Sequence, residues 1–304
     1  MKQIKQIVMP LTVGVLLAMG AQAQTKIALE GQDYVINSTS NAISTAGSIL
    51  YEWYRNNVLI PVCTTATCIV PANLCYGNNV EFRRKAIAVA VDCWGDREKW
   101  APTTIVVTFK CGGGHGTRIS GTCWADRNVG EAGAFTSTRD EPGPVYQWNR
   151  NTALSTTGSP GTIPAGWNST LDQSTTWTVN PCPAGWTLPS PSQLQALHDA
   201  GSTIASPPTK GTIFPGAFYG PNHANCTLSR TLDVVYPENM DNCIFLPAGG
   251  FCHTSSPPGG FYAMGETGDY WSNSGLSLHF AVNGSPYIGG TINLGAYSIR
   301  CVKN

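Results

Sequence analysis

Eleven cysteines and five histidines are the residues of this 304-residue chain that could bind a metal ion, attack a substrate or form cross-links. No two cysteines form a C-x-x-C pair, so the spacing typical of zinc sites is missing. His253 directly follows Cys252, but adjacent side chains seldom face the same point, and an imidazole-activated thiolate is not expected. The remaining histidines are scattered: His115, His198, His223 and His279. We therefore expect the cysteines to form disulfide bonds.

Several cysteine pairs are candidates for these bonds. Cys182 precedes a predicted helix and Cys301 lies in the last predicted strand, so a bond between them would tie the end of a domain to its start. Three local pairs are further candidates: Cys63–Cys68, Cys75–Cys93 and Cys243–Cys252. Cys226 is an alternative partner in the last of these pairs. Because eleven is an odd number, at least one cysteine is unpaired or pairs with another molecule.

Motifs for catalysis are missing. The chain has no Gly-x-Ser-x-Gly, no His-Glu-x-x-His and no spaced carboxylate pair, so we expect no catalytic residue and no cofactor. The turn at 238–242 offers carboxylate and amide oxygens of the kind that calcium prefers. A solvated turn is the simpler interpretation, and we predict no metal site.

The N-terminus has the pattern of a secretory signal. Two lysines precede an apolar run, and the small residues at 21–23 give a cleavage pattern, which predicts a signal peptide over 1–23 and a mature chain from Gln24. The apolar run is too short for a membrane span, and no later segment is long enough for one. We expect an exported protein at the cell surface or outside the cell, with the periplasm as an alternative.

Charge and composition narrow the class further. Eighteen basic and eighteen acidic residues cancel, and charged residues are 12% of the chain, which argues against a nucleic-acid partner held by phosphate contacts. The 33 glycines and 21 prolines are typical of an extracellular protein with short strands and many turns. About 280 residues after cleavage suggest two domains.

Residues 24–110 have the pattern of a β-sandwich. Apolar–polar alternation predicts strands at 26–29, 49–54, 80–83 and 105–109, with Asn56-Asn57 as one of the turns. The segment around Trp53 resembles the third strand of immunoglobulin-like domains in bacterial surface proteins, although no cysteine precedes this tryptophan for the usual inter-sheet bond. Glycines then dominate 111–117, which predicts an interdomain linker. A phosphate-binding loop is not expected there, because no Gly-Lys-Ser/Thr follows.

Residues 118–304 are expected to form a second, α+β domain. Its one clear helix starts at Ser190, which can cap the helix, and Gln193 completes a capping box. Leu194 and Leu197 give the helix an apolar face, and Gly201 ends it. The rest consists of predicted short strands and long loops. The expected fold class of the whole chain is therefore mainly β, with an α+β second domain.

A series of motifs in this second region resembles a known family. The motifs are Cys123-Trp124-Ala125-Asp126-Arg127-Asn128-Val129, Val145-Tyr146-Gln147-Trp148, Cys182 to Pro189, Leu246-Pro247-Ala248-Gly249-Gly250, Asp269-Tyr270-Trp271-Ser272 and Ser298-Ile299-Arg300-Cys301-Val302. Together they resemble the Fibrobacter succinogenes major paralogous domain of exported Bacteroidota proteins. That family is similar to the C-type-lectin-like fold, which formylglycine-generating enzymes and the variable proteins of diversity-generating retroelements share. We expect the large side chains of the motifs in the core: Trp186, Leu188, Tyr270 and Trp271.

The resemblance also implies a place for ligand binding. In retroelement-diversified relatives the variable positions lie just before the final Arg-Cys-Val strand, and the segment 271–297 occupies that place. This segment is rich in Tyr, Ser, Gly and Asn, as antibody paratopes are. The expected ligand-binding residues are Asn273, Ser274, His279, Asn283, Ser285, Tyr287 and Asn293. An ordinary hairpin surface is the alternative.

We therefore predict an exported, non-catalytic protein that binds a protein or a glycan, and whose binding face is diversified if a retroelement acts on it. Two alternatives stay open. In a surface fibre, the same face would pack against a neighbouring subunit. An oxidase like the formylglycine-generating enzymes would need a reactive cysteine pair, for which Cys243 and Cys252 are the candidates.

Overall fold

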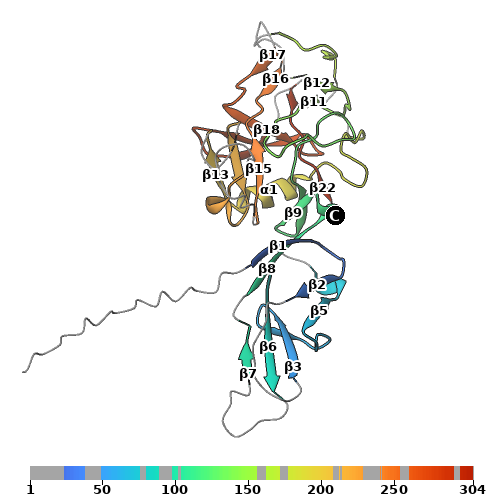
Figure 1. Ribbon diagram of the computed structural model, residues 1–304. Coiled ribbons are helices and arrows are strands. Elements are labelled where there is room, and N and C mark those ends of the chain that lie inside the picture. Colours follow the sequence, from blue (N-terminus) through green and yellow to red (C-terminus); the bar gives the residue numbers. More distant parts are fainter. Residues whose placement is uncertain are drawn as a thin grey trace, which may run out of the picture.

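The computed structural model describes residues 24–37, 49–75, 80–88, 98–101, 104–155, 162–171, 177–207, 212, 214–228, 240, 242–253, 260–290 and 295–303. The predicted signal peptide, Cys93, Asn293 and the acidic residues of the turn at 238–242 lie outside them. The described chain is mainly β with a single α-helix, as the sequence predicts. Figure 1 shows two bodies, one made by strands of the first 110 residues and one by the strands that follow.

The first body contains two described sheets. The larger has the strand order β1-β8-β6-β3-β4, with β7 paired to β6, and β2 pairs with β5 in the smaller sheet. β1 runs parallel to β8, whereas β3 and β6 are antiparallel. The bounds are β1 Gln24–Leu29, β2 Tyr34–Asn37, β3 Ile49–Arg55, β4 Val58–Ile60, β5 Thr67–Val70, η1 Ala72–Leu74, β6 Val80–Ala88, β7 Glu98–Trp100 and β8 Ile105–Lys110.

Side-chain alternation explains how these strands enclose a core. Trp53, Phe82 and Val107 lie on three neighbouring strands, point inward and are fully buried. Asn56 and Asn57 adopt left-handed backbone angles (φ 46° and 66°) and make the tight turn between β3 and β4 that the sequence predicts. The core of this body draws only on residues that precede Lys110.

Four disulfide bonds are present among the described residues: Cys63–Cys68, Cys111–Cys123, Cys182–Cys301 and Cys226–Cys243. The predicted bonds Cys63–Cys68 and Cys182–Cys301 are thus confirmed. The prediction that Cys243 bonds to Cys252 is wrong, because Cys243 lies in one hydrophobic cluster with Cys226 while Cys252 lies in another. Four disulfide bonds in one chain indicate that the protein resides in an oxidising compartment outside the cytoplasm.

Within the described part of the chain two cysteines keep free thiols, Cys75 and Cys252, and both are buried. The Cys75 thiol donates to the carbonyl oxygen of Val70 at 3.4 Å. The prediction that Cys75 is disulfide-bonded is therefore wrong, because its thiol is free, and the predicted partner Cys93 lies outside the described residues. No described helix is long and apolar enough to cross a membrane.

The glycine-rich segment 111–117 is held by close contacts. The Cys111–Cys123 bond anchors its first residue, and Gly116 pairs with Cys111. A methyl group added to Gly112 would lie 2.3 Å from the ring of Trp186, so the absence of a side chain lets this ring approach the backbone. The segment includes η2 (Gly112–Gly114) and leads directly into β9 (Gly116–Ile119). The predicted division into two domains stays a prediction.

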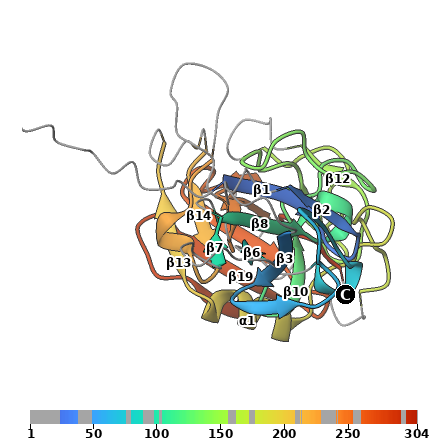
Figure 2. The same cartoon turned by 60° about the horizontal axis from the view of Figure 1, so that its bottom comes forward.

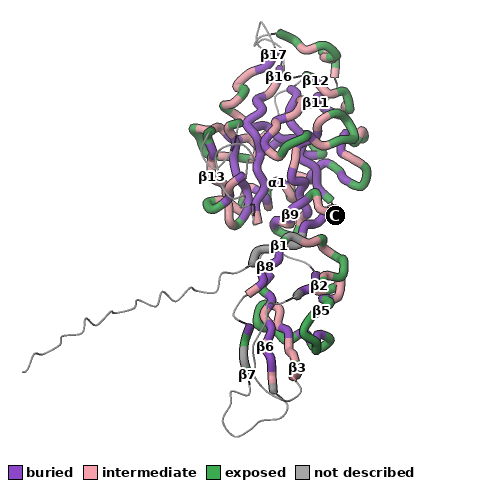
Figure 3. The backbone as a smooth tube through the Cα atoms, in the orientation of Figure 1, coloured by how far each residue is buried: buried purple, intermediate pink, exposed green. Residues whose placement is uncertain are grey.

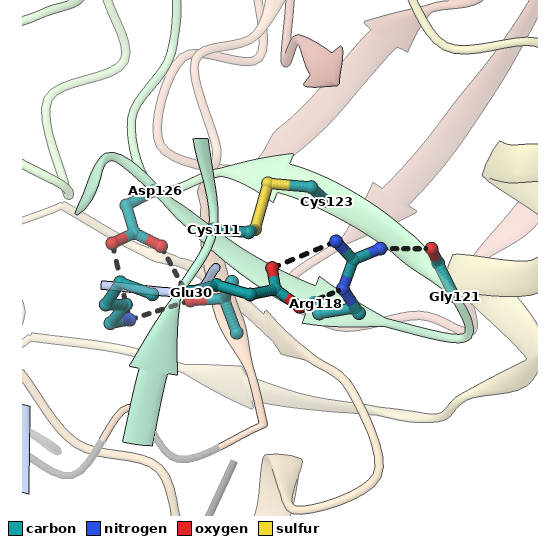
Figure 4. The surroundings of a disulfide bond; sticks show 8 residues. Glu30, Cys111, Arg118, Gly121, Cys123 and Asp126 are labelled. Atoms are coloured by element: carbon teal, nitrogen blue, oxygen red, sulfur yellow. Dashed lines mark hydrogen bonds and ion pairs between the residues drawn. A yellow bond between two sulfur atoms is a disulfide. The ribbon is translucent and has the colours of Figure 1, made fainter. Parts of the chain in front are cut away.

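Ion pairs also join the two bodies beside this segment (Figure 4). Arg118 on β9 donates from Nε and Nη2 to the two carboxylate oxygens of Glu30, at 3.0 and 2.9 Å. The Lys110 ammonium, at the end of β8, lies 3.4 Å from the Asp126 carboxylate. Thr117 bridges this pair, because its hydroxyl accepts from Lys110 and donates to Asp126.

The second body consists of several small sheets. Their orders are β22-β10-β9, β12-β11-β21-β16-β17, β13-β14-β15 and β18-β19-β20. The bounds are β10 Thr122–Ala125, β11 Val145–Gln147, β12 Ala153–Leu154, α1 Pro191–Asp199, β13 Ser202–Ala205, β14 Gly216–Tyr219, η4 His223–Asn225, β15 Ile244–Pro247, β16 Phe251–His253, β17 Gly260–Tyr262, β18 Thr267–Trp271, β19 Leu276–Ala281, β20 Tyr287–Gly290, β21 Ala296–Tyr297 and β22 Val302–Lys303.

Helix α1 forms where the sequence predicts it. The Ser190 hydroxyl accepts from the backbone N–H of Gln193, and the Gln193 side chain accepts from the backbone N–H of Ser190. This capping box is complete, with a proline in the first turn. Leu194 and Leu197 are the buried residues of the helix, as expected from its apolar face.

The sequence motifs converge on one buried arginine. Arg300 is 1% exposed and donates three hydrogen bonds, to the Asn128 side chain at 2.9 Å and to the carbonyl oxygens of Ala125 (2.9 Å) and Phe245 (2.7 Å). Asn128 in turn donates to the Tyr270 hydroxyl at 3.1 Å. Burial lowers the pKa of Arg300 to about 10. The motifs therefore build the frame of this body, and its buried backbone is the purple tube of Figure 3.

The motif aromatics lie in that frame, as predicted. Trp271 is fully buried, and its indole N–H donates to the carbonyl oxygen of Tyr146 at 2.7 Å. Tyr270 is also fully buried, and its hydroxyl donates to the Pro247 carbonyl oxygen at 2.8 Å. Trp186 is 6% exposed. The polar side-chain atoms of Trp271 and Tyr270 are satisfied inside the protein, so these two residues are structural.

Candidate functional site

The sheet β18-β19-β20 carries two of the predicted binding residues on its strands, His279 and Tyr287, and four more in its turns. Its register places Asp269 opposite His279, and His279 opposite Tyr287. Side chains that are directly opposed on neighbouring strands lie on the same face of a sheet. One face of the sheet therefore presents a row of a carboxylate, an imidazole and a phenol, which we call the Asp269–His279–Tyr287 row.

The opposite face of this sheet is apolar and packs on the helix. Leu278 and Phe280 alternate with His279 along β19 and are fully buried, in one cluster with Leu194 and Leu197 of α1. Figure 2 shows α1 beside β19. Because this face is fixed by the core, the row of polar side chains must face the other way.

Asp269 fixes the orientation of His279. The Nδ1 atom of His279 lies 2.8 Å from the Asp269 carboxylate, whose side chain is 9% exposed. Since a carboxylate can only accept a hydrogen bond, Nδ1 donates, and a neutral imidazole then has an acceptor at Nε2. That atom has no hydrogen-bond partner among the described residues. It is therefore available to a ligand.

Tyr287 is the exposed member of the row, with 54% of its surface accessible. Its ring lies 4.8 Å from the His279 ring, centroid to centroid. A methyl group added to Gly289 would lie 2.9 Å from the same tyrosine ring, so the ring covers that glycine. One side of the ring is thus supported by the strand while the rest is accessible. Such a ring can stack against an apolar group or a second ring.

A second histidine holds the turn that precedes Tyr287. The Nε2 atom of His198, on α1, lies 3.2 Å from the carbonyl oxygen of Pro286. Its Nδ1 atom lies 3.0 Å from the Asp199 carboxylate. The helix therefore restrains the β19–β20 turn as well as the buried face of the sheet.

The other predicted residues lie at the two ends of the sheet. Asn273 and Ser274 are exposed in the β18–β19 turn, and Asn283 and Ser285 are exposed in the β19–β20 turn. Because β19 has six residues, the two turns are separated by roughly 20 Å. The structure therefore brings His279 and Tyr287 together. The residues of the β18–β19 turn stay apart from those of the β19–β20 turn.

Sequence reasoning missed Asp269 and His198. Asp269 belongs to a motif that was assigned to the core, and only the strand register shows that it faces His279. Period-two alternation gives no signal in β18, because Gly268, Asp269, Tyr270 and Trp271 are all buried. No local pattern relates His198 to a turn that follows it by 88 residues.

The cysteines suit structure rather than nucleophilic chemistry. Cys243 is disulfide-bonded, and desolvation raises the pKa of the Cys252 thiol to about 12. A nucleophilic cysteine needs a lowered pKa instead. Burial also lowers the pKa of the neighbouring His253. Among the described residues, no group of three His, Cys, Asp or Glu side chains is arranged to hold a metal ion.

Comparisons with known proteins do not assign this site. The chain matches no protein-family model, no curated protein and no solved structure.

Proposed function

We propose that this is an exported, non-catalytic binding protein that recognises a protein or a glycan through the outward face of the sheet β18-β19-β20. In this proposal the second body has a C-type-lectin-like fold, the first is an immunoglobulin-like spacer, and the protein acts at the cell surface or outside the cell. The binding uses no metal and no cofactor. The observation that carries the proposal is the Asp269–His279–Tyr287 row.

Three properties of the row support recognition. Tyr287 offers an exposed aromatic surface, and tyrosine is enriched among the residues that dominate binding energy at interfaces. His279 is fixed by Asp269, so its hydrogen-bonding atom loses little freedom when a ligand binds. The sheet is anchored on α1, which makes the face rigid before binding.

The test measures binding to an array of purified glycans and to a panel of intact bacterial and host cells. His279→Ala and Tyr287→Ala should each weaken binding by about 2 kcal/mol, or about thirtyfold. Tyr54→Ala is the matched control, because Tyr54 is a partly buried tyrosine on a strand of the first body, and binding should be unchanged. Retention of full binding by both row variants would refute the proposal.

A fibre subunit is the second candidate, and one observation favours it. β4 is an edge strand of the larger sheet in the described part of the chain, and Val58 (69%) and Leu59 (44%) are exposed on it. Exposed apolar edge strands can pair with another chain. A ladder of polymers in native electrophoresis, without binding to any glycan or cell, would favour this alternative.

A further inference from the structure

A small cavity beside the junction of the two bodies lies apart from the candidate binding face. It has a volume of about 30 Å³. That is room for about two water molecules or for the end group of a larger molecule. The residues that line it are Gly114, His115, Asp126, Arg127, Phe135 and Arg139. None of them belongs to the sheet β18-β19-β20.

The walls of the cavity are fixed by the backbone. The backbone N–H of Asp126 donates to the His115 carbonyl oxygen at 2.8 Å. The loop that follows folds back on itself, because Val129 pairs with Phe135 as an isolated bridge. The Phe135 ring then packs edge-on against Trp186, with 5.4 Å between the centroids. Its position makes one wall apolar.

Among the described residues that line the cavity, Asp126 is the acidic one, and it is ion-paired. Asp126 is 3% exposed, and one of its carboxylate oxygens lies 3.4 Å from the Lys110 ammonium and 3.3 Å from Nη2 of Arg139. The other oxygen accepts from the Thr117 hydroxyl at 2.7 Å. One carboxylate therefore faces two cations, of which Arg139 also lines the cavity.

Arg127 adds a further positive charge to the lining. Its guanidinium makes a long hydrogen bond, from Nη1 to the Thr136 carbonyl oxygen at 3.4 Å. A guanidinium has five N–H donors, so most of them remain available. The nearby acids do not line the cavity: the Asp140 carboxylate accepts from the Thr138 hydroxyl, and the Glu141 carboxylate accepts from the Ser137 backbone N–H.

We propose that this cavity, which we call the Arg127–Arg139 pocket, binds a carboxylate or sulfate group. Planar guanidinium groups match the geometry of such anions and bind them with charge-assisted hydrogen bonds. The apolar Phe135 wall excludes water on one side and so strengthens those bonds. The anion is either free in solution or the acidic end of a ligand such as a uronic acid.

Isothermal titration calorimetry of the mature full-length protein tests the pocket, with sodium sulfate, sodium acetate and sodium glucuronate at constant ionic strength. Saturable binding of at least one anion is expected. Arg127→Ala should weaken it about tenfold, because a charge-assisted hydrogen bond is lost. Arg150→Ala is the matched control: Arg150 also lies in a loop and donates to a backbone carbonyl oxygen at 3.3 Å, but it does not line the pocket.

Arg127→Lys keeps the positive charge but loses the planar guanidinium with its paired N–H donors, so this variant should bind the anion with intermediate affinity. Thermal unfolding of each variant verifies that it is folded. Tighter binding of glucuronate than of acetate would identify the anion as part of a sugar. Similar affinities would show that a free carboxylate is sufficient for binding. Absence of saturable binding for all three anions overturns the proposal. Equal weakening in Arg127→Ala and Arg150→Ala also overturns it, since bulk charge would then be the cause.

Discussion

His253 illustrates at the residue scale how burial acts on an ionisable group. It lies on β16, is 8% exposed, and stacks on the rings of Tyr262 and Phe251 at centroid distances of 4.5 and 5.4 Å. These neighbours remove water from the imidazole, which disfavours its charged form and lowers its pKa from the usual 6.5. The unfolded chain keeps the usual value, so protonation favours unfolding.

The stability contributed by His253 is therefore present above the unfolded pKa and is lost as pH falls below about 6.5. We expect the free energy of unfolding to fall between about pH 7.5 and about pH 5, and to fall less steeply in His253→Phe, which keeps a stacked ring but cannot be protonated. Urea denaturation across this range measures both slopes. Identical slopes for the wild type and His253→Phe would contradict this assignment.

At the scale of elements, local signals were sufficient where the stabilising contacts are local. The capping box of Ser190 and Gln193 and the turn at Asn56-Asn57 involve neighbours in sequence, and both elements form as predicted. The segment 111–117 was predicted as a linker from its glycines alone. Its close contact with Trp186 joins residues about 70 positions apart, and no local pattern reports such a contact. For the same reason the sequence predicts His279 and Tyr287 as binding residues but does not place Asp269 beside them.

Gly112 and Gly113 allow the contact with Trp186 to be separated from backbone strain. Both have left-handed angles, φ 62° and 72°, so an alanine at either position is strained by about 1 kcal/mol. Only at Gly112 would the added methyl group collide with the Trp186 ring, whereas at Gly113 no atom lies within 4 Å. Gly112→Ala should therefore cost about 2 kcal/mol more than Gly113→Ala in chemical denaturation. Equal losses would show that the segment tolerates displacement and acts as the linker that the sequence predicts.

At the scale of the whole molecule, a buried frame supports exposed turns. Arg300 and the motif aromatics are buried and hydrogen-bonded, while the turns that carry Asn273 and Asn283 are exposed. Substitutions in the turns therefore leave the frame intact. The sequence motifs indicated where this frame lies because large apolar side chains and cysteines mark a core. The proposed recognition depends instead on a few exposed side chains, which no pattern of burial marks in the sequence.

The Cys182–Cys301 bond joins the two ends of the frame. The length of the loop that it closes predicts how much it adds to the free energy of unfolding. It joins residues 119 apart, whereas Cys63–Cys68 joins residues 5 apart, and all four cysteines are buried. In the chain-entropy description, restricting the unfolded chain contributes about 5 kcal/mol for the long loop and about 2 kcal/mol for the short one. Replacing each pair by alanines should therefore lower the free energy of unfolding by about 3 kcal/mol more for Cys182 and Cys301. Both double variants lose buried sulfur atoms, so the difference between them isolates the loop. If the two losses are equal, the length of the closed loop does not determine how much each bond stabilises the protein. Other contacts would then already hold the second body together, and the Cys182–Cys301 bond would add no stability from its long-range closure.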